Sequence, residues 1–140
     1  MGLSKRTDEV GASELSIAFP EYRFLTIDIK ASSESTLHLK SACSMCGPNH
    51  VLVGGELGKI IGRELEFSRH CSSSCYKISH VPDTEAANCV YVNGVLIRRS
   101  DDEFPNSKPV FDKIGGKQIQ VTASELAKVD GALTCCSLLF

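Results

Sequence analysis

Two adjacent cysteines, Cys135 and Cys136, follow the turn-forming pair Asp130-Gly131 in an apolar stretch. A cysteine thiolate is a nucleophile, and thiol catalysis also needs an acid/base partner, which is most often histidine. His38 is a candidate partner, because alternation over residues 37–41 predicts a short strand with His38 on its polar face. On spacing alone, a buried cysteine pair and a surface histidine explain these residues better.

A second group of residues has the chemistry of a metal site. Cys43 and Cys46 form one thiolate pair, and His70, Cys71 and Cys75 supply a second pair with an imidazole nearby. Such donors suit tetrahedral zinc. However, the turn after Cys46 is not typical of a zinc knuckle. We therefore favour a core cysteine at position 43 and loop cysteines at 71 and 75.

Charged residues offer weaker signals. Arg6 precedes a predicted helix and could bind a carboxylate through two parallel hydrogen bonds, although an isolated arginine is usually solvated. The spacing of five acidic residues does not separate catalytic carboxylates from solvated ones, and we predict the solvated alternative. They are Asp83, Glu85, Asp101, Asp102 and Glu103.

The composition sets limits on the class of protein. The 140 residues suit one domain, and the hydrophobic fraction of 42% is typical of a globular one. The net charge of −2 argues against binding to nucleic acid or an anionic membrane. No apolar run approaches the roughly 20 residues that span a bilayer. An odd count of seven cysteines, with a polar N-terminal segment, predicts free thiols in a cytoplasmic protein.

The predicted elements repeat along the chain. Apolar spacing predicts helices at residues 7–18, 57–67 and 105–114, and a short helix or turn at 124–128. Strands are predicted at 23–29, 37–41, 50–53, 76–81, 118–121 and 134–140, and Asn93-Gly94 predicts a hairpin within 88–99. A ββαβ unit therefore occurs twice, over about 37–81 and 88–121. A partial unit precedes them and a lone strand follows, which indicates a repeat or propeller and predicts that further chain normally precedes residue 1.

Six short stretches in order carry a family resemblance. Together they resemble dimethylarginine dimethylaminohydrolase, of the pentein (amidinotransferase-like) superfamily. They are GLSKRT, LHLKSACSMCGPN, EAANCVYVNG, FPNS, VTASELAKVDG and LTCCS.

The resemblance implies an α/β fold, a five-bladed ββαβ propeller with the active site in its central channel. The chain would supply a little over two blades. Residues 1–140 would form the C-terminal part of a single catalytic domain, with the N-terminal half absent. In the family that half carries the acidic residues that bind the guanidinium, a second arginine and a lid loop.

The resemblance also implies residue roles. Cys135 is similar to the family's nucleophile and His38 to its general acid/base. Arg6 would bind the substrate α-carboxylate, and the Val129 carbonyl would accept a hydrogen bond from the α-amino group. Asp130 would lie near the guanidinium. Cys136 would point to the opposite side of its predicted strand, into packing.

The implied activity is hydrolysis of asymmetric dimethylarginine and monomethylarginine to citrulline and a methylamine, which would relieve inhibition of nitric oxide synthase. No cofactor is implied. The partner would be a small methylated arginine, with no nucleic acid and no membrane. Zinc would act only as an inhibitor, at Cys135 and His38. The alternative is a catalytically incomplete fragment that serves in binding or assembly. The sequence does not determine the oligomeric state.

Overall fold

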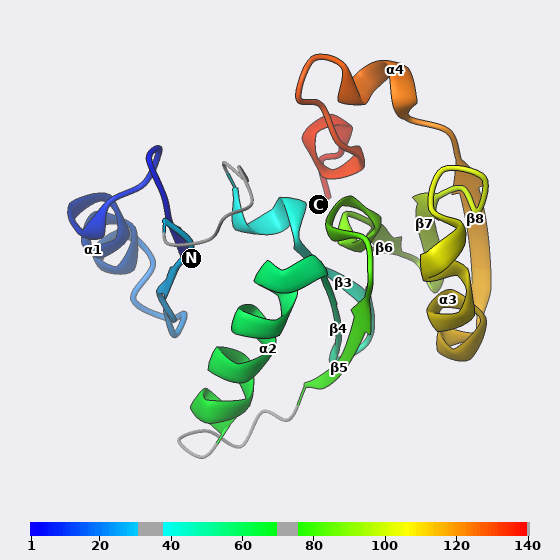
Figure 1. Cartoon of the computed structure of the whole chain (residues 1–140). Coiled ribbons are helices and arrows are strands. Elements are labelled where there is room, and N and C mark those ends of the chain that lie inside the picture. Colours follow the sequence, from blue (N-terminus) through cyan, green and yellow to red (C-terminus); the bar gives the residue numbers. More distant parts are fainter. Residues whose placement is uncertain (31–37, 70–75, 140) are drawn as a thin grey trace.

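The computed structural model describes residues 1–30, 38–69 and 76–139. Within these ranges the chain is a mixed α/β structure, as predicted, and its strands form three small sheets. The sheets follow one another across the molecule in sequence order, from the N-terminal sheet to the sheet of β6–β8 (Figure 1). None of the described helices is both long and apolar enough to cross a membrane.

The first complete unit contains β3 (Cys43–Gly47), β4 (His50–Gly54), α2 (Gly55–Arg69) and β5 (Lys77–Val81). β4 pairs antiparallel with β3 and parallel with β5. A tight turn with Asn49 at φ 52° joins β3 to β4. Asparagine tolerates this left-handed conformation better than most residues. The order of elements is therefore ββαβ, as predicted.

The second complete unit repeats the same topology. It contains β6 (Val90–Val92), β7 (Val95–Arg99), α3 (Lys108–Ile114) and β8 (Lys117–Val121). β7 pairs antiparallel with β6 and parallel with β8. Asn93 and Gly94 both have positive φ, 50° and 77°, as the predicted two-residue hairpin requires.

A partial unit lies at the N-terminal side. β1 (Gly2–Leu3), α1 (Glu9–Ala18) and β2 (Ile27–Asp28) form a β–α–β arrangement with parallel strands. Asp8 caps α1 by accepting a hydrogen bond from the Gly11 amide at 2.9 Å. The strand predicted at 23–29 shortens to two residues because its partner β1 offers only two for pairing.

Two predicted strands are wrong. Residue 37 lies outside the described residues, and the segment after it forms a 3₁₀ turn, η1 (Leu39–Ser41). The C-terminal segment forms η4 (Leu133–Cys136). The strand position beside β4 is instead occupied by β3, which begins after the predicted range. The other short helices are η2 (Thr84–Ala87), η3 (Pro105–Ser107) and α4 (Ser124–Ala127).

Strand β4 contributes to two hydrophobic cores. Leu52 packs with Leu96 and Phe111 between the two complete units. The neighbouring Val51 and Val53 point to the opposite face, into a core that includes residues of β2 and α2. Each sheet thus packs on the next through side chains of alternating direction. This stacking fits the predicted propeller, while closure into five blades remains a prediction.

Candidate active site

Cys135 lies in η4, and its side chain is exposed. Its backbone amide donates to the Ala132 carbonyl at 2.9 Å, which closes the 3₁₀ turn. Cys136 is also exposed, so the prediction that it packs inward is wrong. That prediction required a strand with alternating side chains, and the turn does not provide one.

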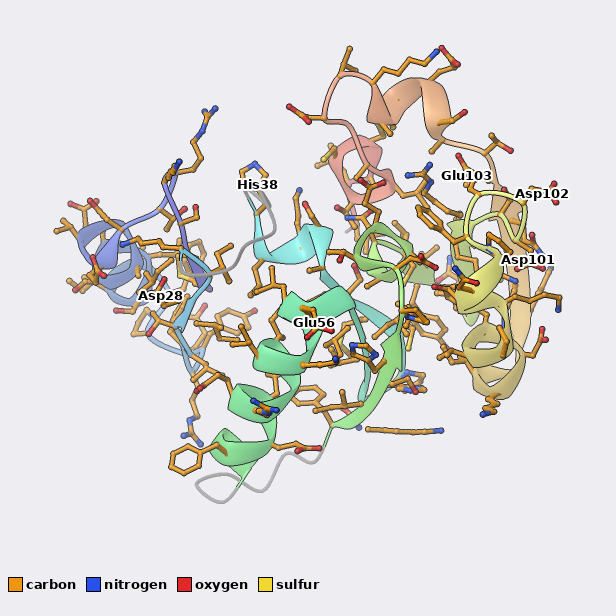
Figure 2. All side chains as sticks on the ribbon, viewed as in Figure 1. Asp28, His38, Glu56, Asp101, Asp102 and Glu103 are labelled. Atoms are coloured by element: carbon orange, nitrogen blue, oxygen red, sulfur yellow. The ribbon has the colours of Figure 1, made fainter. Side chains whose placement is uncertain are left out.

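His38 lies at the N-terminal end of η1. Its backbone is extended, with φ −133° and ψ 137°, and its side chain is exposed. The His38 carbonyl accepts a hydrogen bond from the Ser41 amide at 3.0 Å. Figure 2 shows the imidazole projecting from the end of η1 toward the top of the view, where the C-terminal segment also lies.

A buried asparagine joins the segments that carry these two side chains. Asn88 is 2% exposed. Its Nδ2 donates to the Lys40 carbonyl at 2.8 Å and to Thr134 Oγ1 at 2.9 Å. Its Oδ1 accepts from the Thr134 amide at 3.1 Å. The structure therefore brings the His38 and Cys135 segments together, although no hydrogen bond joins these two side chains among the described residues.

Val129 and Asp130 lie in the turn that ends α4. The Gly131 amide donates to the Leu126 carbonyl at 3.0 Å and the Asp130 amide to the Ala127 carbonyl at 3.2 Å. These two bonds, with Asp130 at φ 57°, form a Schellman motif. Across the described residues the Val129 carbonyl has no hydrogen-bond donor. It is therefore free to accept a hydrogen bond from a ligand.

Arg6 lies in the loop between β1 and α1 and is exposed. Its backbone amide donates to Ser4 Oγ at 3.0 Å. In the part of the chain that the structure describes, no carboxylate pairs with its guanidinium. This loop, η1 and the C-terminal segment all lie in the upper part of the view in Figure 1.

The remaining described cysteines differ from Cys135 in their surroundings. Burial raises the pKa of the thiols of Cys43 and Cys46 to about 11. Burial also raises the pKa of Cys89, which is 2% exposed. A thiol with a raised pKa is a poor nucleophile at neutral pH. All five described cysteines are free, as predicted.

The predicted alternative of a zinc site falls partly outside the described residues. His70, Cys71 and Cys75 are not described. Among the residues that are, no group of three histidine, cysteine, aspartate or glutamate side chains could hold a metal ion. Zinc inhibition at Cys135 and His38 stays a prediction.

Asp83, Asp101 and Glu103 are partly buried, whereas Glu85 and Asp102 are exposed, so the prediction that all five are solvated is wrong. Glu103 binds the buried Arg99 through both of its carboxylate oxygens, at 2.6 and 3.0 Å. Asp101 binds Arg98 at 2.7 Å. These hydrogen bonds lower the pKa of both carboxyl groups. Figure 2 shows Asp101, Asp102 and Glu103 on the side of the molecule away from His38, and Asp101 and Glu103 serve the fold through their arginine contacts.

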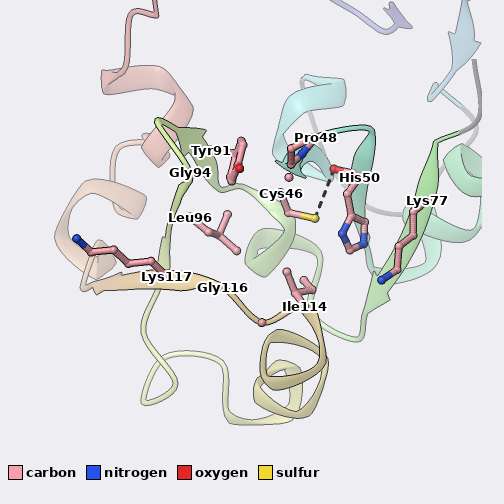
Figure 3. Close-up of a pocket in the computed structure, with 12 residues that line it drawn as sticks. Cys46, Pro48, His50, Lys77, Tyr91, Gly94, Leu96, Ile114, Gly116 and Lys117 are labelled. Carbon is pink, nitrogen blue, oxygen red and sulfur yellow. Dashed lines mark hydrogen bonds between the residues drawn. The ribbon is translucent and has the colours of Figure 1, made fainter.

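A groove of about 260 Å³ lies between the two complete units (Figure 3). Its lining includes Cys46, His50, Tyr91 and Leu96. The Cys46 thiol donates to the His50 carbonyl at 3.5 Å. The groove lies at the C-terminal end of β3, whereas η1 precedes the other end of that strand. None of the predicted site residues lines it.

The chain is similar in sequence to curated proteins along its whole length. No protein-family model matches the chain. Dimethylarginine dimethylaminohydrolase from Pseudomonas aeruginosa is 30% identical over 142 residues, which cover 100% of this chain and 50% of the relative. A Bos taurus protein named putative hydrolase DDAH2 is 26% identical over 147 residues and covers 99% of this chain, again with 50% of the relative. The chain therefore spans about half the length of the curated relatives it matches.

Solved structures agree with the sequence relatives. One solved structure is a cysteine-to-serine mutant of the Pseudomonas aeruginosa enzyme complexed with citrulline. It has a TM-score of 0.74 and 27% identity, and the match covers 100% of this chain and 50% of the enzyme chain. An amidinotransferase from Microseira wollei has a TM-score of 0.68 and 17% identity. The match covers 98% of this chain and 42% of the amidinotransferase chain, and at this identity it shows the shared fold alone. The resemblance to dimethylarginine dimethylaminohydrolase predicted from six stretches is confirmed, and it extends over the whole chain.

Proposed function

We propose that this chain carries the nucleophile and the acid/base of an amidinohydrolase site that acts on N-methylated arginines. The observation that carries the proposal is the junction at Asn88, where the segments of His38 and Cys135 meet. Both side chains are exposed, and their chemical types suit thiol catalysis. The fold is similar to that of a dimethylarginine dimethylaminohydrolase.

The chemistry follows from these two side chains. The Cys135 thiolate attacks the guanidinium carbon, and His38 protonates the amine that leaves. His38 then takes a proton from the water that hydrolyses the thiouronium intermediate, and Cys135 is regenerated. The products are citrulline and dimethylamine, or methylamine from monomethylarginine. A bound guanidinium cation also favours the thiolate, so the substrate helps to activate its nucleophile.

The complexes of solved relatives support this chemistry. One dimethylarginine dimethylaminohydrolase is complexed with citrulline. A histidine-to-glycine variant forms an adduct with S-methyl-L-thiocitrulline. Citrulline is the product that the proposed reaction would release, and S-methyl-thiocitrulline resembles a substrate with a sulfur leaving group.

Three further residues would bind the amino-acid end and the guanidinium. Arg6 would bind the α-carboxylate, because its guanidinium is exposed and has no carboxylate partner among the described residues. The Val129 carbonyl would accept from the α-ammonium group. Asp130 would place a negative charge near the guanidinium. The loops that carry these residues are positioned by β1, α1 and α4.

The proposal extends to the whole protein. The chain would form the C-terminal part of a single pentein-type catalytic domain, and the enzyme would act in the cytoplasm without a cofactor. By consuming methylated arginines it would relieve inhibition of nitric oxide synthase. Zinc would inhibit it by binding Cys135 and His38.

An alternative function is binding or assembly without catalysis. The N-terminal unit is partial, and Val10 and Ile17 of α1 are 65% and 75% exposed. Apolar side chains on an incomplete unit favour packing against a complementary segment. In this alternative the chain binds methylarginine weakly, since few carboxylates offset desolvation of the guanidinium.

The test is citrulline release from asymmetric dimethylarginine by the purified chain. Cys135→Ser should abolish citrulline release. Cys136→Ser, an equally conservative change at the adjacent exposed thiol, should leave citrulline release unchanged. Release that survives Cys135→Ser would contradict the proposal. Absence of release by the wild-type chain, with binding of citrulline measured by calorimetry, would favour the alternative function.

A further inference from the structure

Asn88 is a buried polar residue that the proposed chemistry does not use. It follows η2, and 2% of it is exposed. A buried amide is stable in a fold when its donors and acceptor all have partners. Here the partners are Lys40 and Thr134, which are 48 and 46 residues away from Asn88 in the sequence.

The partners determine how the amide must be oriented. The Thr134 backbone amide can only donate, so it faces Oδ1 at 3.1 Å. The Lys40 carbonyl can only accept, so it faces Nδ2 at 2.8 Å. Only one orientation of the amide satisfies both contacts. A carboxylate of the same shape would keep the contact with the Thr134 amide and would place an oxygen against the Lys40 carbonyl.

We propose that Asn88 is a positioning residue of this site, which sets the spacing between His38 and Cys135. The inference rests on the proposed function. Lys40 lies two residues after His38, and Thr134 directly precedes Cys135. The side chains of His38 and Cys135 extend from short 3₁₀ turns, which are rarely rigid by themselves. Asn88 is the shared tether that holds both turns to one buried point, as catalytic groups require.

Two substitutions separate the two sides of the tether. Asn88→Asp should release the His38 side, because the new carboxylate repels the Lys40 carbonyl. Thr134→Val should loosen the Cys135 side, because it removes the hydroxyl that accepts from Nδ2 at nearly constant volume. Gln118→Glu is the matched control. The Gln118 amide also bridges elements, with Nε2 donating to the Phe111 carbonyl at 2.8 Å and Oε1 accepting from Arg98 at 2.7 Å.

The experiment measures the rate of Cys135 alkylation by iodoacetamide against pH. Every protein in this experiment is the full chain with Cys71→Ser, Cys75→Ser and Cys136→Ser introduced as a common background. This background leaves Cys135 as the exposed thiol among the described residues. The pH profile tests whether His38 acts on the reactivity of Cys135, and His38→Ala supplies the reference without the imidazole. Circular dichroism confirms that each variant is folded.

The expected result is a shift of the profile toward that of His38→Ala in Asn88→Asp and in Thr134→Val, with no shift in Gln118→Glu. Where citrulline release is measurable, kcat should fall about tenfold or more while KM changes less. Folded variants that keep the wild-type profile would overturn the proposal, and so would a His38→Ala profile equal to wild type. If Asn88→Asp does not fold, Thr134→Val decides. A wild-type chain that releases no citrulline counts against the proposed function alone, because alkylation needs no turnover.

Discussion

At the scale of single residues, the surroundings of each cysteine predict its reactivity. At pH 8 a thiol with a pKa of about 11 is a thiolate about one time in a thousand. In a Cys71→Ser, Cys75→Ser chain, we therefore expect a disulfide reagent such as Ellman's to modify Cys135 and Cys136 quickly. The thiols of Cys43, Cys46 and Cys89, which are buried or half-buried, should react only after denaturation. Fast reaction of a third thiol in the folded chain would contradict the burial described above.

His50 predicts how stability depends on pH. Burial lowers the pKa of His50 in the folded chain, and the charge of Lys77 adds to this effect. The His50 imidazole therefore binds a proton more readily in the unfolded chain than in the folded one. The contribution of His50 to folding stability is thus complete above a pH of about 6.5 and decreases as the pH falls below that value. We expect the urea midpoint to decrease between about pH 7.5 and about pH 5.5.

His50→Gln provides the control for this pH dependence. Glutamine does not titrate and can still bond Ser79, whose hydroxyl lies 2.9 Å from His50 Nε2. The decrease in the urea midpoint over the same pH interval should be smaller in this variant. An equal decrease in both proteins would assign the effect to other groups.

Residue types could be predicted from the sequence better than their partners. The stretches GLSKRT, LHLKS and LTCCS were sufficient to select Arg6, His38 and Cys135. Asn88 was missed, although it stands inside EAANCVYVNG, because nothing in the sequence shows that its partners are Lys40 and Thr134. A buried amide is identified by its contacts, and these depend on the tertiary structure.

At the scale of elements, the turn after α4 depends on a glycine. A Cβ at Gly131 would lie 2.5 Å from the Leu126 side chain and 2.9 Å from the Leu126 carbonyl oxygen. The side chain can move, but the carbonyl belongs to the Schellman motif. We expect Gly131→Ala to lower the free energy of unfolding by about 1–3 kcal/mol, measured by urea denaturation.

Gly11→Ala is the matched control for that substitution. Gly11 lies within α1, where its added Cβ would meet only Asp8 Oδ1, at 3.6 Å. Alanine has the higher helix propensity, so this variant should be more stable by about 0.5–1 kcal/mol. The same chemical change should thus have opposite signs at the two positions. A loss at both would point to a general intolerance of alanine.

The Glu103 carboxylate connects β7 to the segment that leads into α4. It binds Arg99, whose side chain is 8% exposed, and it accepts from the Ala123 amide at 3.2 Å. Removal of Glu103 leaves a largely buried cation whose remaining carboxylate partner among the described residues is Glu85, at 3.2 Å. We expect Glu103→Ala to cost about 3 kcal/mol, and the neighbouring exposed Asp102→Ala to change stability by less than about 0.5 kcal/mol. Equal decreases in the melting temperature of the two variants would contradict a stabilising role for the Glu103–Arg99 pair.

Local signals predicted some elements and failed for others. The Asn93-Gly94 hairpin was predicted correctly, because its positive φ angles depend on two residues alone. The strands at 37–41 and 134–140 were wrong, because a strand exists only beside a partner. β3 occupies the place next to β4, and short-range backbone bonds turn both predicted segments into 3₁₀ helices.

At the scale of the molecule, the repeat is the feature that the sequence predicted best. Two ββαβ units follow from the periodicity of apolar residues, and the structure has them with the same strand order. Which faces pack together could not be predicted, because the alternating residues of β4 are apolar on both sides. The structure assigns Leu52 to one core and Val51 and Val53 to the other.

This shared strand predicts cooperative unfolding. Leu52 is 0% exposed and Val53 is 1% exposed, and they stabilise different cores from the same strand. Loss of β4 would therefore expose both cores, so the sheets should unfold together. We expect Leu52→Ala to cost about 2–5 kcal/mol, and to increase hydrogen exchange in β2, β4 and β7 alike. Ile119→Ala, at a side chain that is 44% exposed, should leave exchange nearly unchanged. Faster exchange in β7 alone after Leu52→Ala would show that the units unfold independently, and the stacked cores would then not act as one cooperative structure.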